Sequence, residues 1–322
     1  MSLTINNNLM AQNAARNLSE AYGRLGTSTQ RLSSGLRINS AADDAAGLAI
    51  RELMRAEISS MRQGIRNAND AISMIQTADG ALAVIDEKLI RMKELATQAA
   101  TGTYNSDQRL IIDSEYQAMA SEITRIANAT KFNGIYLLNG NISSPATNSA
   151  DWGIGINDGE GRHDGSGLSS RGPLKIHFGP SNSSAEDYYY IAIGNSTASA
   201  LGVGNASDRT RAYGPNVEAS GGFSISTQQG AQQALDALEN AILSKDNIRA
   251  SLGALQNRLA NTITNLSIQA ENLQAAESRI SDADVALEMT EFVRNQIITQ
   301  AAVAMLAQAN ALPRMAMQLI SG

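Results

Sequence analysis

A long apolar repeat in the first third of the chain is the feature that most limits how it can fold. From Met54 to Ala99, apolar side chains recur at alternating spacings of three and four residues. Over about 45 residues, such a repeat makes a helix of roughly 68 Å at 1.5 Å per residue. This is far longer than a helix of a compact globular domain, so we expect its apolar stripe to pack along another long helix.

A partner for this helix is predicted in the last third of the chain. Apolar residues there stand seven apart: Leu252, Leu259, Leu266, Leu273, Ile280 and Leu287. A strict heptad favours a left-handed supercoil with another helix over burial in a compact core. We therefore expect the two repeats to pack against each other.

Both ends of the chain also carry helical apolar repeats. The first runs through Leu18, Tyr22, Leu25, Thr29, Leu32 and Leu36, and the second through Ile298, Met305, Leu312 and Leu319. No charged residue lies between Arg294 and Arg314, and surfaces with so little charge are usually covered by protein. We expect these surfaces to be covered by other copies of the chain. The candidate self-assembly residues are Leu18, Leu25, Leu32, Ile298, Met305, Leu306, Leu312 and Leu319.

The middle of the chain has a different pattern. Residues 141–225 are rich in Gly, Asn, Ser and Asp, and they hold four of the five prolines, which break helix interiors. Leu174, Ile176 and Phe178 alternate as in a strand. The sequence therefore predicts a mainly α fold, with long coiled-coil-like helical hairpins formed by both chain termini and a small β-rich central insert.

Local signals mark where the elements begin and end. Gly102 can end one helix, and Asn105 with Gln108 can begin the next through a capping box. Asn133-Gly134 is a turn signal before a short strand. Further upstream, Gly35 can end a helix, and the polar residues that can cap the following one are Asn39, Ser40, Asp43 and Asp44.

Composition excludes several classes of function. The net charge is −6 and no run of Lys or Arg is present, which argues against nucleic acid as a partner. The chain has no cysteine, which excludes disulfides and thiol catalysis. No apolar stretch reaches the ~18–20 residues of a membrane span. The start has neither a basic segment nor an apolar core, so we expect any export to proceed without the usual signal peptide.

Candidate chemical sites are weak. The two histidines, His163 and His177, have no catalytic or metal-binding motif around them. A calcium loop through Asp158, Glu160 and Asp164 would need a ligand where Arg162 stands, and its closing glutamate is missing. We expect no catalytic residue, cofactor or metal, and a structural protein rather than an enzyme.

Four segments resemble bacterial flagellin, the subunit of the flagellar filament. They are "QRLSSGLRINSAADDAAGLAI" (30–50), "FNGIYLL" (132–138), "RISDADVALEMTEF" (279–292) and "QAAVAMLAQANALP" (300–313). The resemblance covers roughly residues 1–140 and 226–322 and implies a secreted, extracellular subunit of the bacterial flagellum. It also implies an inner layer of paired terminal helices, an outer layer of long helices, a joint between them near residue 40, and a solvent-facing insert.

On this resemblance the chain divides into five parts. These are an inner-core N-terminal helix (1–38), outer-core N-terminal helices with a short β hairpin (39–140), a variable surface-exposed β-rich insert (141–225), an outer-core C-terminal helix (226–285) and an inner-core C-terminal helix (286–322).

The resemblance also implies partners. The chain would polymerise with itself, be threaded unfolded through the flagellar type III export apparatus with an export chaperone, and meet cap and hook-junction proteins. No nucleic acid or membrane partner is expected. One alternative is a hook–filament junction protein of the flagellin-like type. A second is a membrane-surface anchor, although residues 295–313 lack the Lys, Arg, Trp and Phe that such helices carry.

A last implied partner is the animal Toll-like receptor for flagellin. Flagellins that activate it present an arginine and a leucine four residues apart and a glutamate on the returning helix. These positions match Arg91, Leu95 and Glu115. The alternative is ordinary helix surface, with Leu95 part of the packing stripe beside Met92 and Ala96.

Overall fold

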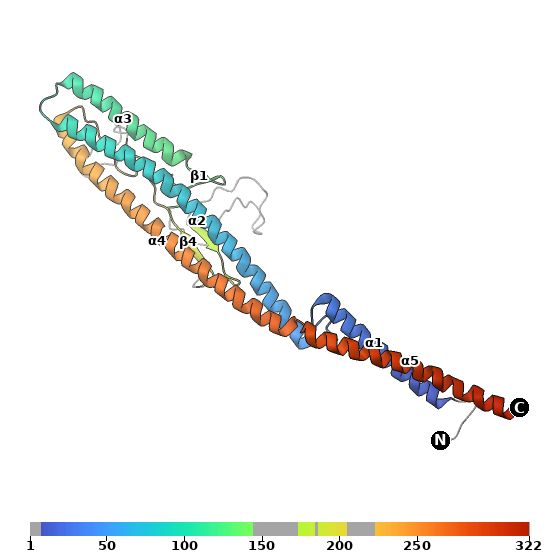
Figure 1. The fold of residues 1–322 in the computed structure, drawn as a ribbon. Helices are drawn as coiled ribbons and strands as arrows, with labels where there is room; N and C mark the ends of the chain where they lie inside the picture. The colour runs from blue at the N-terminus through green and yellow to red at the C-terminus, as the bar shows by residue number, and fades with distance from the viewer. Residues whose placement is uncertain (1–7, 144–172, 184–185, 205–222, 322) are drawn as a thin grey trace, which may run out of the picture. The chain divides into compact units, whose positions relative to one another are not determined.

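The structure is a computed structural model that describes residues 8–143, 173–183, 186–204 and 223–321; side chains are described only as far as Met315 (Figure 1). Its elements, in chain order, are α1 (Leu9–Ser34), α2 (Ala45–Ala100), α3 (Ser106–Ala129), β1 (Lys131–Phe132), β2 (Ile135–Tyr136), β3 (Leu174–His177), β4 (Tyr188–Ile191), α4 (Gln228–Ser281) and α5 (Val285–Ser321). The predicted fold class, mainly helical with a small strand insert between the helical flanks, is confirmed.

The chain forms two compact units. The terminal unit combines residues 1–59 with 269–322, and the central unit comprises residues 60–268. The long helices α2 and α4 contribute residues to both units. In the described part of the chain, no helix is both long and apolar enough to cross a membrane.

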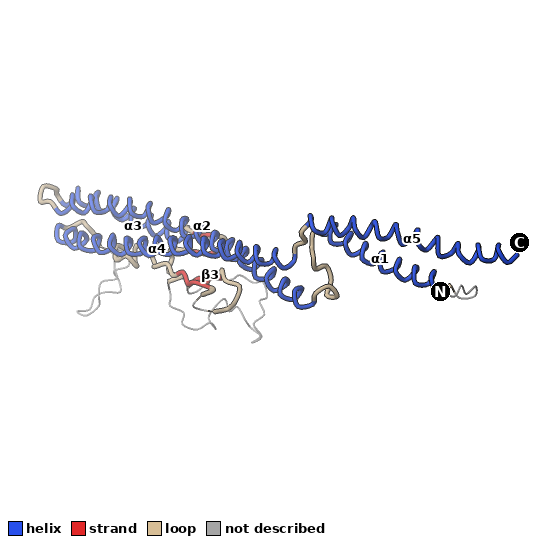
Figure 2. Tube along the Cα trace, turned by 60° about the horizontal axis from the view of Figure 1, so that its bottom comes forward, coloured by secondary structure: helices blue, strands red, loops and turns tan. Residues whose placement is uncertain are grey.

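The core of the central unit lies between α2, α3 and α4, which run side by side (Figures 1 and 2). The predicted stripe of α2 faces inward, with Leu82, Ile85 and Leu89 fully buried. Leu252 and Leu259 of α4 belong to the same core cluster. The expected packing of the two apolar repeats is therefore confirmed.

Two ion pairs join α2 to α4 in the central unit. Lys245 Nζ lies 2.5 Å from Asp86 Oδ1, and the lysine side chain is only 2% exposed. Arg249 Nε donates to Asp79 Oδ1 at 2.7 Å. Because breaking a buried pair leaves a charge without compensation, a slip of one helix along the other would be costly. The two ion pairs therefore favour one axial register between α2 and α4, which apolar contacts alone specify less strictly.

Helix α3 begins as the sequence predicts. Asn105 Oδ1 accepts a hydrogen bond from the Gln108 amide at 2.9 Å, and Gln108 Oε1 accepts one from the Asn105 amide at 3.1 Å. The Arg109 side chain then donates to the carbonyls of Ala99 and Thr101 at the end of α2. These bonds satisfy backbone groups that helix ends leave free, and they hold α3 against α2.

Two small antiparallel sheets flank the helices of the central unit. Strands β1 and β2 are joined by Asn133 and Gly134, both with positive φ, as a two-residue hairpin turn requires. Strands β3 and β4 pair from Leu174 opposite Ile191 to His177 opposite Tyr188. The strands predicted for the insert are confirmed, and most of the rest of residues 141–225 lies outside the described residues.

The heptad of α4 ends earlier than predicted. Helix α4 stops at Ser281, and Leu287 lies in α5 with 65% of its surface exposed. The Asp284 side chain accepts hydrogen bonds from the Ala286 and Leu287 amides, which makes it the cap of a new helix. The prediction that Leu287 continues the stripe is therefore wrong, because the helix is interrupted before it.

Candidate assembly surface

Helices α1 and α5 of the terminal unit pack against each other in antiparallel orientation (Figures 1 and 2). One end of the pair is held by Asn8, whose side-chain amide donates to the Ala309 carbonyl at 2.8 Å. At the other end, Arg31 Nη1 lies 3.7 Å from Glu288 Oε2. The two termini of the chain therefore pair directly.

The most deeply buried positions of the contact between α1 and α5 carry small and polar side chains. Its buried members are Ala21 and Ser28 on α1 and Asn295, Thr299 and Ala309 on α5. Five predicted assembly residues lie half-buried along it: Leu18, Leu25, Leu32, Leu306 and Leu312. Small side chains remove little apolar surface from water, so this pair is weakly held compared with the core of the central unit.

The prediction for α1 places the intervening positions of the apolar stripe one residue too late in the sequence. Leu18, Leu25 and Leu32 do face α5, but the intervening positions are Ala21 and Ser28, not Tyr22 and Thr29. Tyr22 is 55% exposed. A helix position shifted by one residue turns by about 100°, which moves a side chain from the contact to the surface.

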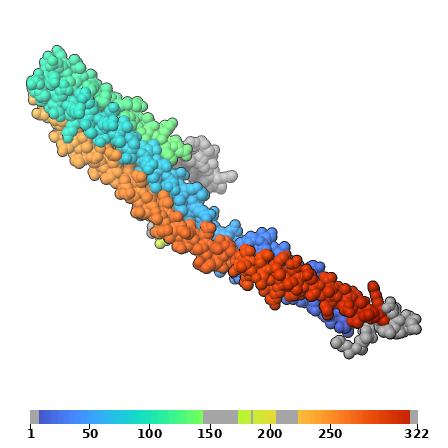
Figure 3. Space-filling model, viewed as in Figure 1, coloured from blue at the N-terminus to red at the C-terminus, as the bar shows by residue number. Residues whose placement is uncertain are grey.

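Large apolar side chains of α5 remain uncovered within the chain. Ile298 is 42% exposed and Met305 64%, so α1 covers the predicted stripe only in part. As far as Met315, where the described side chains end, the other large exposed apolar residues of α5 are Val285, Leu287, Met289, Val293, Ile297, Val303 and Met315. On the face seen in Figure 3, α5 (red) is open to solvent along most of its length.

These exposed residues surround α5 rather than forming one stripe. Neighbours such as Ile297 and Ile298 are separated by about 100° around a helix, and Val303 and Met305 by about 200°. Helices that present large apolar side chains on several sides are normally buried on those sides. Since α1 covers only one side, these side chains stay exposed in the single chain. The side chain of Leu319 lies outside the described residues.

Pro313 explains the bond made by Asn8. Helix α5 runs through Pro313, which has no amide hydrogen to donate to the Ala309 carbonyl four residues earlier. The Asn8 side chain supplies the missing donor, while its Oδ1 accepts from the Ala11 amide and caps α1. A single side chain thus satisfies one helix start and one orphaned carbonyl of the partner helix.

The connection from α1 to α2 is a well-defined joint in the terminal unit. Gly35 ends α1 with a φ of 72°. The Arg37 amide donates to the Ser281 carbonyl at 2.6 Å, next to a β-bridge between Leu36 and Asp282. The buried Arg51 donates to the Ile38 carbonyl at 2.8 Å. The segment between the helices is therefore attached to the ends of both α2 and α4.

Of the two aspartates predicted to cap α2, only Asp44 does so. Asp44 Oδ1 accepts from the Gly47 amide at 2.9 Å and caps the helix. Asp43 instead accepts from the Asn39 and Ser40 amides inside the joint. Those backbone hydrogen bonds stabilise the ionised form and lower the pKa of the Asp43 carboxyl.

The predicted receptor residues do not share one surface. Arg91 Nε and Nη2 donate to Glu115 Oε1 at 3.0 and 2.9 Å, which places these two side chains together across α2 and α3. Hydrogen bonds to Glu94 and then to Glu115 raise the pKa of the Arg91 guanidinium. Leu95 is 2% exposed and belongs to the core, as the alternative interpretation had it.

The weak chemical candidates gain no support. His177 is described on β3, and its ring lies 6.0 Å from that of Tyr188. His163 and the loop through Asp158, Glu160 and Asp164 lie outside the described residues. Among the residues that are described, no three His, Asp or Glu side chains are grouped as a metal site would require.

Comparison with known proteins identifies the family. The model of the bacterial flagellin N-terminal helical region matches residues 5–143, and that of the bacterial flagellin C-terminal helical region matches residues 235–320. This chain belongs to the bacterial flagellin family. It is 39% identical to the flagellin of Bacillus subtilis (strain 168) over 325 residues, which cover 99% of this chain and 100% of that one.

Other relatives support the same assignment. The flagellin is 37% identical to the "Flagellar filament 33 kDa core protein" of Treponema phagedenis over 308 residues, 96% of each chain. A solved structure of a putative flagellar hook-associated protein from Vibrio parahaemolyticus shares the fold, with a TM-score of 0.52 at 15% identity over 74% of this chain and all of that one. This flagellin is accordingly a structural subunit of the filament of the bacterial flagellum, in a family of structural proteins.

Several residues that build this flagellin's terminal pair were not predicted. Asn8, Ser28, Asn295 and Thr299 are polar, so a search for apolar repeats passes over them. One signal was available for Asn8, because Pro313 inside a helical pattern leaves a carbonyl without a donor. Nothing in the sequence showed that the donor would come from the other end of the chain.

The bond between Asn8 and the Ala309 carbonyl predicts a non-additive double-mutant cycle. Asn8→Ala should lower the stability of the assembled terminal pair by about 1–3 kcal/mol, because it removes a helix cap and strands a carbonyl. In a Pro313→Ala background the alanine amide can serve Ala309, so the same substitution should cost only about 1 kcal/mol for the lost cap. Thermal dissociation of filaments from the four variants measures both costs, and equal costs would contradict the assignment.

Proposed function

We propose that this flagellin polymerises by covering the exposed sides of α5 with helices of neighbouring copies. The observation that carries the proposal is the exposure of large apolar residues on several sides of α5, with Met305 at 64%. Charge repulsion is small there, because no charged residue lies between Arg294 and Arg314. The half-buried leucines of α1 and α5 would hold these two helices together. Helices of neighbouring subunits would then pack around the pair.

Met305→Asp tests this proposal. In the single chain the new carboxylate is solvated, so the circular dichroism spectrum and the melting of the central unit should not change. In the polymer it would be buried without a partner at a cost of about 3 kcal/mol or more per subunit. The critical concentration for polymerisation should rise more than roughly a hundredfold.

Met305→Leu is the matched control, since it keeps the apolar surface and the side-chain volume. It should polymerise like the wild type when filaments are sedimented over a concentration series. Normal filament yield from Met305→Asp would show that this part of α5 stays in water and would reject the proposed surface.

We also propose that the subunit is secreted through the flagellar type III export apparatus, with an export chaperone, and assembles outside the cell beneath a cap and beyond hook-junction proteins. The small and polar contact between α1 and α5 supports this, because a weakly held pair is easily opened for threading. In dilute monomer, α1 and α5 should exchange their amide hydrogens within seconds while the central unit is protected. Long-lived protection of both terminal helices would contradict the proposal.

The alternative role at the hook–filament junction differs in copy number. The fold that this chain shares with a putative flagellar hook-associated protein does not separate the two roles. The similarity to the Bacillus subtilis flagellin extends over nearly the full length of both chains, and this favours the role of main filament subunit. Purified filaments should contain this chain as their dominant component rather than as a trace.

A second proposed role is recognition by the animal Toll-like receptor for flagellin, through Arg91 and Glu115. Its support is the exposed pair that these side chains form across two helices, 48% and 44% exposed. We leave Leu95 out as a direct contact, because it is buried among the residues of the core. Its role in recognition would be limited to holding α2 in place.

Receptor signalling by monomeric Arg91→Ala and Glu115→Ala variants tests this role. Each should lower signalling at least about tenfold, since each removes one partner of a charged contact at a protein interface. The matched control is Arg125→Ala, which breaks another exposed pair, with Glu122 on α3. Circular dichroism should show unchanged helix content in all three, and signalling equal to wild type in both Arg91→Ala and Glu115→Ala would refute the role.

A further inference from the structure

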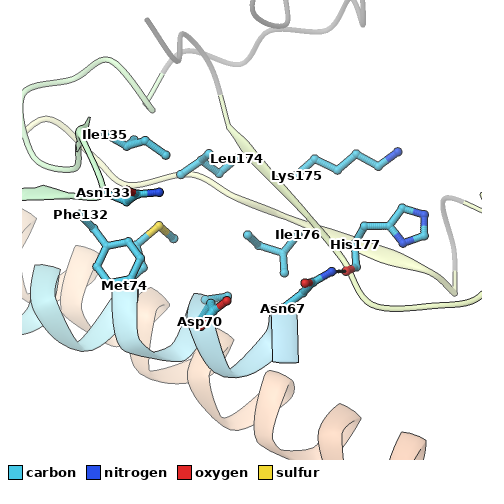
Figure 4. A pocket seen from close by; sticks show the side chains of 11 residues that line it. Asn67, Asp70, Met74, Phe132, Asn133, Ile135, Leu174, Lys175, Ile176 and His177 are labelled. Carbon is cyan, nitrogen blue, oxygen red and sulfur yellow. Dashed lines mark hydrogen bonds between the residues drawn. The ribbon is translucent and has the colours of Figure 1, made fainter. Parts of the chain in front are cut away.

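A cavity of about 330 Å³ lies in the central unit, where α2, the β1–β2 hairpin and β3 meet (Figure 4). Its size falls in the range of small-molecule sites in proteins, roughly 300–1,000 Å³. None of its residues takes part in the pairing of α1 and α5. Helix α2 forms its floor with Asn67, Asp70, Ala71 and Met74.

The walls of the cavity are mostly apolar. Phe132 and Ile135 come from the hairpin, and Leu174 and Ile176 from β3. Figure 4 shows the Phe132 ring beside the Met74 side chain, with Ile135 and Leu174 above them. A small apolar group that binds here would be removed from water and would contact side chains of α2, the hairpin and β3.

The walls are held in position by contacts to α2 and by the hairpin turn. The Asn67 side chain donates to the His177 carbonyl at 2.9 Å, which ties the end of β3 to α2. One turn earlier, a side chain at Gly64 would collide with the Phe178 carbonyl, so β3 approaches α2 as closely as glycine allows. The hairpin is fixed by its two-residue turn at Asn133 and Gly134. The cavity is therefore formed before any ligand enters.

The charge at the cavity is negative. Asp70 is exposed, and within the described residues its carboxylate makes no ion pair or hydrogen bond. Two cations lie nearby, and neither is paired with it. Arg66, one turn earlier on α2, donates to Gln63 Oε1 at 3.0 Å. The ammonium of Lys175, which lines the cavity, lies 3.6 Å from the centre of the Tyr188 ring and donates to Asn182. Figure 4 shows the side chains of Lys175 and His177 pointing away from Met74 and Phe132.

These features define the chemistry of an occupant. An anion would be repelled by the Asp70 carboxylate, because Arg66 and Lys175 contact other groups and are not paired with it. A metal ion would find one carboxylate, and the described residues hold no group of three ligands. A neutral apolar molecule would fill the walls but leave Asp70 unused.

We propose that this cavity binds a small organic ammonium ion with an apolar body. The apolar part would lie between Met74, Phe132 and Leu174, and the ammonium would donate to the carboxylate of Asp70 on α2. This binding activity is separate from polymerisation, so it can be measured on the full-length monomer. Its failure would leave the proposed assembly surface untouched.

Calorimetric titration with three matched probes tests the proposal: 2-phenylethylammonium, the neutral 2-phenylethanol and the anionic phenylacetate. The ammonium should bind about tenfold or more tightly than the alcohol, as expected for a hydrogen bond between charged groups. Phenylacetate should show no binding. Equal affinity for ammonium and alcohol, or no binding of the ammonium, would overturn the proposal.

Two variants locate the site. Asp70→Asn should remove the preference for the ammonium and leave the fold intact, because Asp70 has no partner among the described residues to lose. Its matched control, Asp236→Asn, makes the same charge change at an exposed position of α4 and should bind like the wild type. Ile135→Phe should fill the cavity and weaken both the ammonium and the alcohol. An equal effect of the two asparagine variants, or full binding by a folded Ile135→Phe, would reject this location.

Discussion

The terminal unit depends on one constraint: α5 exposes large apolar side chains on several sides, and α1 does not cover them. Helix α1 meets α5 along small and polar side chains such as Ser28, Asn295 and Thr299. Residues as large as Met305 and Ile298 are left in water. An isolated chain cannot resolve this, whereas a polymer resolves it at every subunit, because each copy offers the same surfaces to its neighbours.

The central unit has the opposite balance and explains why the subunit can exist before it polymerises. Its long helices bury a continuous core from Ala68 to Ala99 of α2, and the buried pair of Lys245 with Asp86 fixes their register. The large apolar core thus lies in one unit and the proposed assembly surface in the other. The joint around Arg37 and Arg51 connects α1 to the ends of both α2 and α4.

The sequence predicts the parts of this structure that depend on local or periodic signals. The stripe of α2, the capping box at Asn105 and the Asn133-Gly134 turn all follow from residues close together in the chain. The contact between α1 and α5 was harder, because Ala, Ser and Asn carry little periodic signal. The burial of Leu95 and the cavity beside Asp70 depend on how distant segments meet, which no single segment encodes.

The central claim is that α5 is covered on all sides in the filament, and site-directed labelling tests it most directly. The chain has no cysteine, so single substitutions give specific labels. Val303→Cys and Met305→Cys lie on different sides of α5, and Ser181→Cys lies on the exposed β3–β4 connection. We expect a maleimide to react with all three in the monomer and only with Ser181→Cys in filaments. Filaments in which Val303→Cys and Met305→Cys react as fast as in the monomer would contradict the account.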